Sequence, residues 1–414
     1  MLRTIFLSGI ISLLSIFQSC EKDELITEDN DNNTPPPSSA PNEQKIISSS
    51  NAFGFDLYKE VASQSDADEN ILLSPLSVSM ALAMTKNGAE GVTYEEIKNT
   101  LRLDGTDDGT ANQSYRDLLD KLPGKDPDVT TQIANSIWYR EGFSVEEAFI
   151  TTNEEYYDAE VSALDFSDPG AAKGIINDWV NNKTNNKIPE IIETIDGAHV
   201  MFLINAVYFE ASWTKAFDEE KTEQKPFTLQ SGQTVEVDMM SSDELSFGYY
   251  EHDDLEVISL PYGNEKYYFT ALLPAENSSI TDLSDQFTSD NWSTWVAATD
   301  TSHNYTLEMP KFELEYDAEL NDMLIAMGMP SAFGNGANFG RINPGAQLAI
   351  DKVKHKTFIR VDEAGTEAAG ATSVGIVITS ANPVIQLNRP YIYVIHEKET
   401  GAILFTGRMM NPTQ

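Results

Sequence analysis

The sequence predicts an α+β fold with large antiparallel β-sheets. Helical patterns dominate the first part of the 414-residue chain, and strand patterns dominate the rest. Helices that precede most of the strands are typical of α+β folds rather than of alternating α/β folds. Hydrophobic residues make up 41% of the chain, which is enough for a substantial core.

The predicted helices come first. Residues 51–63 carry apolar side chains at helical spacing. Residues 75–89 are apolar nearly all round, which predicts a buried helix with Pro75 in its first turn and Gly88 near its end. A further amphipathic pattern covers residues 171–184.

The predicted strands follow, and each is rich in β-branched or aromatic residues. The chain shows no internal repeat and no second linker after residue 44, so residues 44–414 are expected to form one domain. The strand patterns cover residues 201–213, 255–263, 266–275, 305–316, 390–397 and 402–410.

The N-terminus predicts export. A short cationic start and an apolar stretch too short to span a bilayer precede Cys20, the only cysteine, so no intramolecular disulfide can form. Residues 1–19 resemble a bacterial lipoprotein signal peptide, after which Cys20 becomes the lipidated first residue. The alternative is a plain secretory signal with an incidental cysteine. Residues 21–24, "EKDE", resemble the acidic tag of surface-exposed lipoproteins of Bacteroidetes.

Residues 20–43 predict a lipidated, disordered linker, because the stretch that follows the acidic tag is rich in acids, Asn, Ser and Pro and leaves little to bury. The net charge of −39, from 27 basic and 66 acidic side chains, argues against nucleic acid and anionic membranes as partners. Contact with the membrane is therefore expected only through the lipid anchor, on an outer-membrane lipoprotein exposed at the cell surface.

No motif indicates an enzyme, a metal site or a cofactor. None of the five histidines forms an H-x-x-x-H pair, and the chain lacks G-x-S-x-G and G-x-x-x-x-G-K-[ST] motifs. The Gly-rich residues 334–340 do not follow a strand and are interpreted as a loop. A Ser/His/Asp triad assembled only in space stays open at this point.

The C-terminal third resembles the serpin family of serine protease inhibitors. Residues 348–372, "LAIDKVKHKTFIRVDEAGTEAAGAT", resemble the serpin hinge, and residues 388–412 resemble the serpin C-terminal strand pair. Earlier motifs follow in the family order, at residues 70–89, 134–139, 164–188, 203–218, 239–240, 260–262 and 309–316.

This resemblance implies three β-sheets, about eight to nine helices and an exposed reactive centre loop at about 364–388. It also implies a monomeric suicide substrate. A serine protease, or in some cases a cysteine protease, attacks the loop and forms a covalent acyl-enzyme. The loop then inserts into the main sheet as a new strand and distorts the attached protease.

The hinge residues fit that insertion. In a strand, alternate side chains point to opposite faces. One set, beginning with Thr366, is uncharged and small at its leading end, and the other carries the only charge, Glu367, toward solvent. The predicted hinge comprises Gly365, Thr366, Glu367, Ala368, Ala369, Gly370, Ala371 and Thr372. Taken alone, the stretch also fits a flexible linker or an ordinary edge strand.

The resemblance places the reactive bond at Thr379–Ser380, within one or two residues. Between residues 364 and 388 there is no Lys, Arg or aromatic residue, so a trypsin-like pocket would hold an unpaired charge. Val377, Ile378 and Thr379 suit the small or medium apolar pockets of elastase-like and subtilisin-like proteases.

By resemblance, Ser74, Ser77, Asn205 and His355 form the shutter beneath the point where the main sheet opens. Trp213 matches the breach at the top of that sheet. The simpler interpretations are that Ser74 caps the helix starting at Pro75, that His355 is a hydrogen-bonded core histidine, and that Trp213 is a large core aromatic.

Two other functions compete with inhibition. A non-inhibitory serpin could serve as a binding or carrier protein on the same fold, but such members often have bulky or charged hinges and this hinge is small. An unrelated surface adhesin or hydrolase is disfavoured by the ordered set of motifs.

Overall fold

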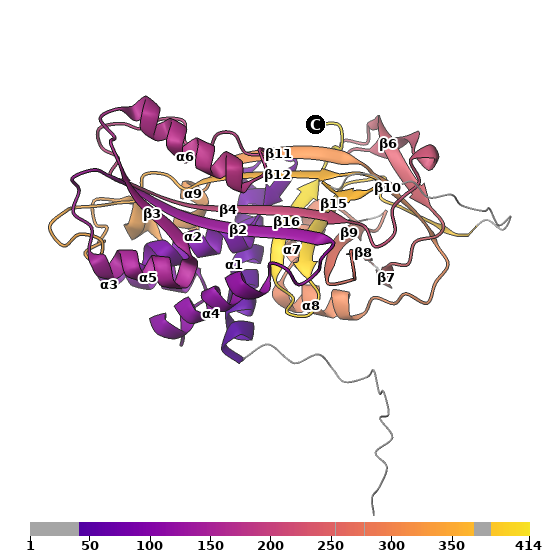
Figure 1. Cartoon of the computed structure of the whole chain (residues 1–414). Coiled ribbons are helices and arrows are strands. Elements are labelled where there is room, and N and C mark those ends of the chain that lie inside the picture. The colour runs from indigo at the N-terminus through magenta and orange to yellow at the C-terminus, as the bar shows by residue number, and fades with distance from the viewer. Residues whose placement is uncertain (1–40, 253, 277, 368–381) are drawn as a thin grey trace, which may run out of the picture. The chain divides into compact units, whose positions relative to one another are not determined.

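The computed structural model describes residues 41–252, 254–276, 278–367 and 382–414 (Figure 1). This part of the chain forms nine α-helices, two short 3₁₀-helices and three β-sheets, which confirms the predicted α+β fold. The helices are α1 (Pro41–Gln64), α2 (Pro75–Asn87), α3 (Gly91–Thr100), α4 (Asp108–Lys121), α5 (Glu147–Tyr157), α6 (Pro169–Lys183), α7 (Ile280–Gln286), α8 (Ser289–Ala297) and α9 (Asn321–Ala326), with η1 (Glu219–Lys221) and η2 (Pro330–Phe333).

The main sheet has six strands in the order β11-β12-β13-β4-β2-β3. Along β12, inward side chains are buried and outward ones are half-buried, as expected for a sheet with covered faces. Its strands are β11 (Phe312–Glu319), β12 (Lys354–Val361), β13 (Gly365–Thr366), β4 (Met201–Ser212), β2 (Val129–Arg140) and β3 (Ala159–Leu164).

The other two sheets contain the remaining strands. The second six-stranded sheet joins β1 (Ile71–Leu73), β16 (Ile403–Met409), β15 (Tyr391–Glu397), β9 (Tyr267–Pro274), β8 (Leu255–Tyr262) and β7 (Gly248–His252). A four-stranded sheet joins β14 (Val384–Gln386), β10 (Thr306–Pro310), β6 (Thr234–Ser242) and β5 (Glu223–Thr228).

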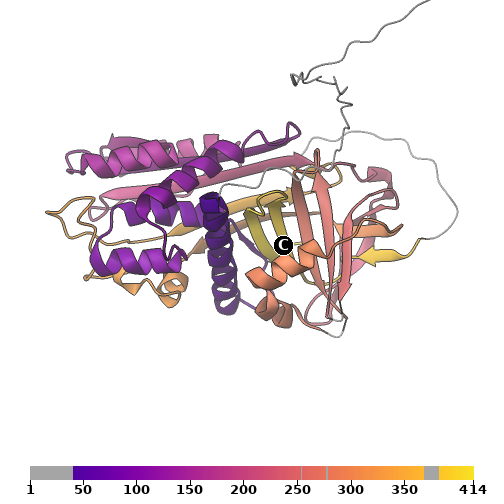
Figure 2. The ribbon, with the colours of Figure 1, turned by 90° about the horizontal axis from the view of Figure 1, so that it is seen from below.

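Helices cover both faces of the main sheet. Figure 2 shows the magenta α6 on one side of the sheet and the indigo α1 on the other. Ile176 of α6 packs with Trp138 and Ile204 of the sheet in a separate apolar cluster. The apolar residues of α2 belong to the large core on the opposite face. None of the helices within the described ranges is long and apolar enough to cross a membrane.

The predicted helices are confirmed, and the first of them begins before residue 44. Helix α2 begins at Pro75 and is capped at Gly88, and residues 51–63 lie within α1. Helix α1 already starts at Pro41, so the linker ends earlier than the expected residue 43. Glu43 is 1% exposed and forms an ion pair with Lys121 of α4, a partner that the local composition could not reveal.

Candidate functional site

The short strand β13 lies between β4 and β12 and runs antiparallel to both. Gly365 and Thr366 pair with Ser212 and Ala211, and Thr366 also pairs with Val361 of β12. Below β13, no ladder joins β4 to β12 among the described residues. We call the space between residues 201–210 of β4 and residues 354–360 of β12 the slot, with β13 at its upper end.

Gly365 and Glu367 determine where β13 begins and ends. A Cβ atom on Gly365 would lie 2.0 Å from the carbonyl oxygen of Ala211, so only glycine fits there. Glu367 has a φ of +58°, in the left-handed region that non-glycine residues rarely adopt. The extended strand therefore stops at Thr366.

Thr366 points into the core, as its place in the alternation predicted. The residue is 1% exposed, and its Oγ1 lies 2.6 Å from the hydroxyl oxygen of Tyr262. The Tyr262 ring stacks on Trp213 with centroids 4.4 Å apart. Burial raises the pKa of Tyr262 well above its ordinary value, so its hydroxyl stays protonated.

Glu367 was expected to point to solvent in an inserted strand; in this structure the strand ends before Glu367, and its side chain is buried. It lies on the opposite face from Thr366 but is only 7% exposed. Its Oε2 is 3.5 Å from Nζ of Lys187, in the segment after α6. Burial raises the pKa of the Glu367 carboxyl, and the charge of Lys187 opposes that rise.

Trp213 forms two hydrogen bonds to the residues that precede β13. Its Nε1 donates to the carbonyl oxygen of Asp362 at 2.9 Å, and its backbone N–H donates to the carbonyl oxygen of Ala364 at 2.9 Å. The carboxylate of Asp362 accepts hydrogen bonds from the backbone N–H groups of Ala364 and Gly365. Trp213 is thus both a core aromatic and a fastening of the hinge.

Glu363, just before the hinge, is buried and paired. Its Oε1 accepts a hydrogen bond from Thr222 at 2.7 Å and lies 3.4 Å from Nζ of Lys311. Burial opposes ionisation, but these contacts prevail and lower the pKa of the Glu363 carboxyl. The hinge therefore starts from a fixed, charged residue.

The structure brings Ser74 and His355 into direct contact. The backbone N–H of Ser74 donates to Nε2 of His355 at 3.1 Å. Burial lowers the pKa of His355 to about 4, so the ring is neutral and its proton resides on Nδ1. The interpretation of His355 as a hydrogen-bonded core histidine agrees with this contact.

Side-chain capping by Ser74 was wrong. Ser74 occupies the N-cap position of α2 and Pro75 its first turn, but the Ser74 hydroxyl makes no hydrogen bond within the described ranges. The Ser74 residue is fully buried, and its backbone is held by a histidine 281 residues along the chain.

Asn205 and Ser77 lie near the same place. Asn205 donates from Nδ2 to Oδ1 of Asn135 on β2 at 2.7 Å. Ser77, Asn205 and His355 line one cavity of about 510 Å³ at the lower end of the slot. The four predicted shutter residues therefore gather around α2 and the strands on either side of the slot.

The remaining predicted positions lie outside the residues that the structure describes. They are the lipidation site Cys20, the later hinge residues Ala368, Ala369, Gly370, Ala371 and Thr372, the specificity residues Val377, Ile378 and Thr379, and Ser380 of the reactive bond.

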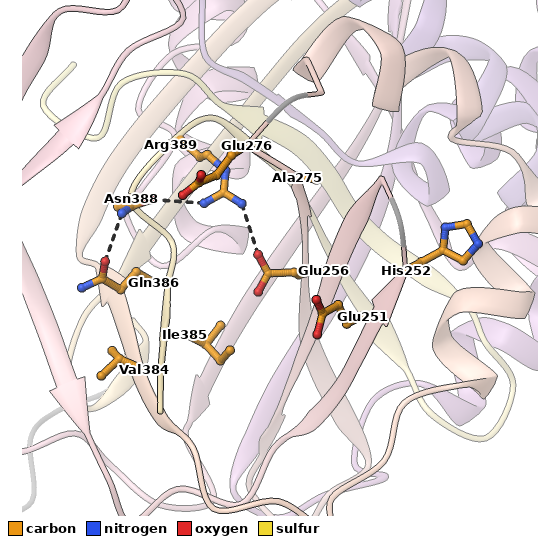
Figure 3. A pocket seen from close by; sticks show the side chains of 10 residues that line it. All are labelled: Glu251, His252, Glu256, Ala275, Glu276, Val384, Ile385, Gln386, Asn388 and Arg389. Atoms are coloured by element: carbon orange, nitrogen blue, oxygen red, sulfur yellow. Dashed lines mark hydrogen bonds and ion pairs between the residues drawn. The ribbon is translucent and has the colours of Figure 1, made fainter. Parts of the chain in front are cut away.

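On its C-terminal side, the predicted loop leads into β14, which pairs in parallel with β10 over three residue pairs. Gln386 donates to the carboxylate of Glu308 at 2.7 Å. Arg389 donates from Nε to the carbonyl oxygen of Pro274 at 2.9 Å. It also donates from Nη2 to Glu256 at 3.1 Å (Figure 3). Gln386, Arg389 and Glu256 border a cavity of about 660 Å³ between β14 and the β7–β8 hairpin.

Sequence reasoning missed the role of Arg389. The available signal was that Arg389 is the first basic residue after a long stretch without Lys or Arg and directly precedes a predicted strand. Lys187 and Tyr262 were also missed, and no local pattern marks either as a partner of the hinge.

Comparisons with known proteins agree over nearly the whole chain. The family described as "Serpin (serine protease inhibitor)" matches residues 48–412. An uncharacterized serpin-like protein of Methanosarcina mazei is 32% identical over 424 residues, which cover 99% of this chain and 98% of that protein. Serpin A3-3 of Bos taurus is 34% identical over 374 residues, which cover 89% and 90%.

Two solved structures show the same architecture. The thermophilic serpin Tengpin in its native state has a TM-score of 0.81 and 32% identity, covering 91% of this chain and 97% of that one. Human thyroxine-binding globulin complexed with its hormone has a TM-score of 0.82 and 28% identity, covering 90% and 100%.

Proposed function

Because this chain belongs to the serpin family, we propose that it is a suicide-substrate inhibitor of serine proteases that traps the acyl-enzyme by loop insertion. The observation that carries the proposal is β13, which is seated between β4 and β12 above a slot that no described strand fills. The backbone N–H and C=O groups of β4 and β12 that face the slot can form hydrogen bonds with an added strand.

The two registers agree on how a longer inserted strand would lie. If pairing continues residue by residue from Thr366, the β4 register sets Thr372 opposite Asn205. The β12 register independently sets Thr372 opposite His355. In this proposal a small hydroxyl residue would reach the shutter, where a larger or charged side chain would hinder insertion.

Two features favour insertion: the strained backbone of Glu367, and the backbone groups of β4 and β12 that no described strand pairs with along the slot. On entering the slot, Glu367 would leave the left-handed region and adopt extended geometry, which releases backbone strain. The intact protein is then a kinetically trapped state that becomes more stable once the loop is cut.

We further propose that the reactive bond is Thr379–Ser380. With Val377 and Ile378 before it, this bond favours elastase-like and subtilisin-like proteases over trypsin. Some cysteine proteases are included as targets because they also form acyl-enzymes.

Residues 1–19 are proposed as the signal peptide and Cys20 as the lipid attachment site. Together they would make the protein an outer-membrane lipoprotein displayed at the cell surface. The segment before α1 would then act as the tether.

A protease panel tests the inhibitory function. Elastase or subtilisin should form a covalent complex that survives boiling in detergent, whereas trypsin should not. Intact-mass analysis should find the released fragment beginning at Ser380. Complete cleavage of the loop while the protease stays fully active would contradict inhibition.

A binding or carrier role is the second candidate, since the similar thyroxine-binding globulin was solved with a bound hormone. Thermal unfolding before and after loop cleavage separates the two functions. A large rise in the melting temperature after cleavage supports insertion, and no rise supports a carrier.

A further inference from the structure

The cavity at the lower end of the slot has the size and character of a small-molecule site. Its volume is about 510 Å³, within the range of about 300–1,000 Å³ that is typical of ligand pockets. The half-buried apolar side chains of Leu203, Phe333, Leu348 and Ile350 line it and keep apolar surface in contact with water. A ligand with an aliphatic body would cover that surface.

The same cavity is lined by two polar groups that lack hydrogen-bond partners among the described residues. On the β12 side, Nε2 of His355 is engaged by Ser74, so Nδ1 carries a proton that no hydrogen bond among the described residues uses. On the α2 side, Ser77 is 7% exposed and lines the cavity, and its hydroxyl makes no hydrogen bond among the described residues.

These groups are complementary to an uncharged head that both donates and accepts hydrogen bonds. His355 offers a donor and the Ser77 hydroxyl can accept or donate, and neither group is charged. The charged residues at the cavity rim are paired with protein groups. Lys354 lies 3.0 Å from both Glu193 and Asp317, and Asp351 lies 3.0 Å from His199. An ionic head would therefore lose its hydration without gaining a free counter-charge.

We propose that this cavity binds a small uncharged amphiphile with an aliphatic tail and a primary amide or alcohol head, and that its occupancy blocks loop insertion. The second part rests on the proposed function. A molecule held between the lower ends of β4 and β12 would occupy the position that the registers assign to the incoming strand. Insertion would stall, water would hydrolyse the acyl-enzyme, and the inhibitor would behave as a substrate.

Calorimetric titration of the full chain with octanamide and octan-1-ol tests the site, with octanoate and octylammonium as charged controls. Both uncharged ligands should bind and raise the melting temperature. The charged ligands should bind at least about tenfold more weakly, because they leave buried polar groups unpaired. Equal binding of all four, or of none, overturns the site.

The variant Leu348→Trp fills the cavity from a loop outside both slot strands. It should abolish octanamide binding, so that inhibition by this variant no longer responds to octanamide, whatever its level without the ligand. The matched control Leu229→Trp alters a half-buried leucine in the β5–β6 turn and should bind octanamide as the parent does.

The effect on inhibition is measured as the number of inhibitor molecules consumed per protease inactivated. Octanamide should raise this number several-fold for the parent and not for Leu348→Trp. Binding that leaves the number unchanged overturns the regulatory part. If octanamide binds but no protease is inhibited even without it, the site stands and the proposed inhibitory function fails.

Discussion

The two ends of the predicted reactive loop are attached to different sheets and by different numbers of contacts. At the N-terminal end, β13 has two residues in the main sheet and stops at a residue with strained backbone. At the C-terminal end, β14 has three pairs with β10 in a different sheet, and Arg389 adds side-chain bonds to the neighbouring strands. In the proposed mechanism the N-terminal end extends along the slot, which no described strand fills, whereas the C-terminal end stays paired in its own sheet. Cleavage between them would therefore release only the end that the slot can accept.

The largest expected effect comes from an arginine at the N-terminal end, in β13. In Thr366→Arg a guanidinium would replace a side chain that is 1% exposed between β4 and β12, at a cost of about 3 kcal/mol or more, so the substituted side chain should leave that place in the intact protein. Insertion would then have to bury it again, which should slow insertion about a hundredfold. The protein should then be cleaved as a substrate, as gel analysis of its products would show. Val384→Arg is the control, because Val384 is 47% exposed at the fixed end, and it should still form the covalent complex. Equal behaviour of both variants would contradict the asymmetry.

The next effect concerns two buried histidines. Burial lowers the pKa values of His355 beside the slot and of His396 in β15 to about 4. In the unfolded chain these two histidines bind protons below about pH 6.5, whereas in the folded protein they stay neutral down to about pH 4. The unfolding free energy therefore falls as the pH is lowered from 6.5 to 4, by about 3 kcal/mol per histidine. His355→Gln and His396→Gln should each flatten this dependence in urea unfolding. Only His355→Gln should also change the rate of complex formation.

Breaking the fixed end should have a moderate effect. Arg389→Ala removes the bonds to Pro274 and Glu256, and we expect a loss of about 1–3 kcal/mol in the unfolding free energy. The number of inhibitor molecules consumed per protease should stay unchanged, because the slot is intact. A rise in that number would show that the C-terminal anchor also controls insertion.

The smallest effect concerns Glu367. Its pKa is raised by burial, so from the ordinary value of 4.5 up to the raised value the folded protein holds a proton that the unfolded chain has lost. Stability therefore falls as the pH rises through this window. Glu367→Gln should remove this fall and give a higher melting temperature than the parent at pH 7, with the two converging below pH 4.5. A parent that is more stable at pH 7 would indicate that the ion pair with Lys187 prevails over burial.

Local sequence patterns predicted the features that depend on residues close to one another in the chain. The apolar run after Pro75 became the buried helix α2, and Thr366, the first small residue of the alternation, is buried. For Ser74 and Glu367 the structure adds partners that are distant in sequence and that no local pattern indicated. His355 engages the backbone of Ser74, and Lys187 covers Glu367.

The sequence by itself determined the composition of the hinge, the order of the family motifs and the buried helix beneath the main sheet, because spacing and side-chain size are local properties. Only the tertiary structure decided that β13 is seated between β4 and β12, that Trp213 and Tyr262 fasten its entry, and that Arg389 holds the opposite end. Those features depend on contacts between residues one hundred or more positions apart, which no local pattern specifies.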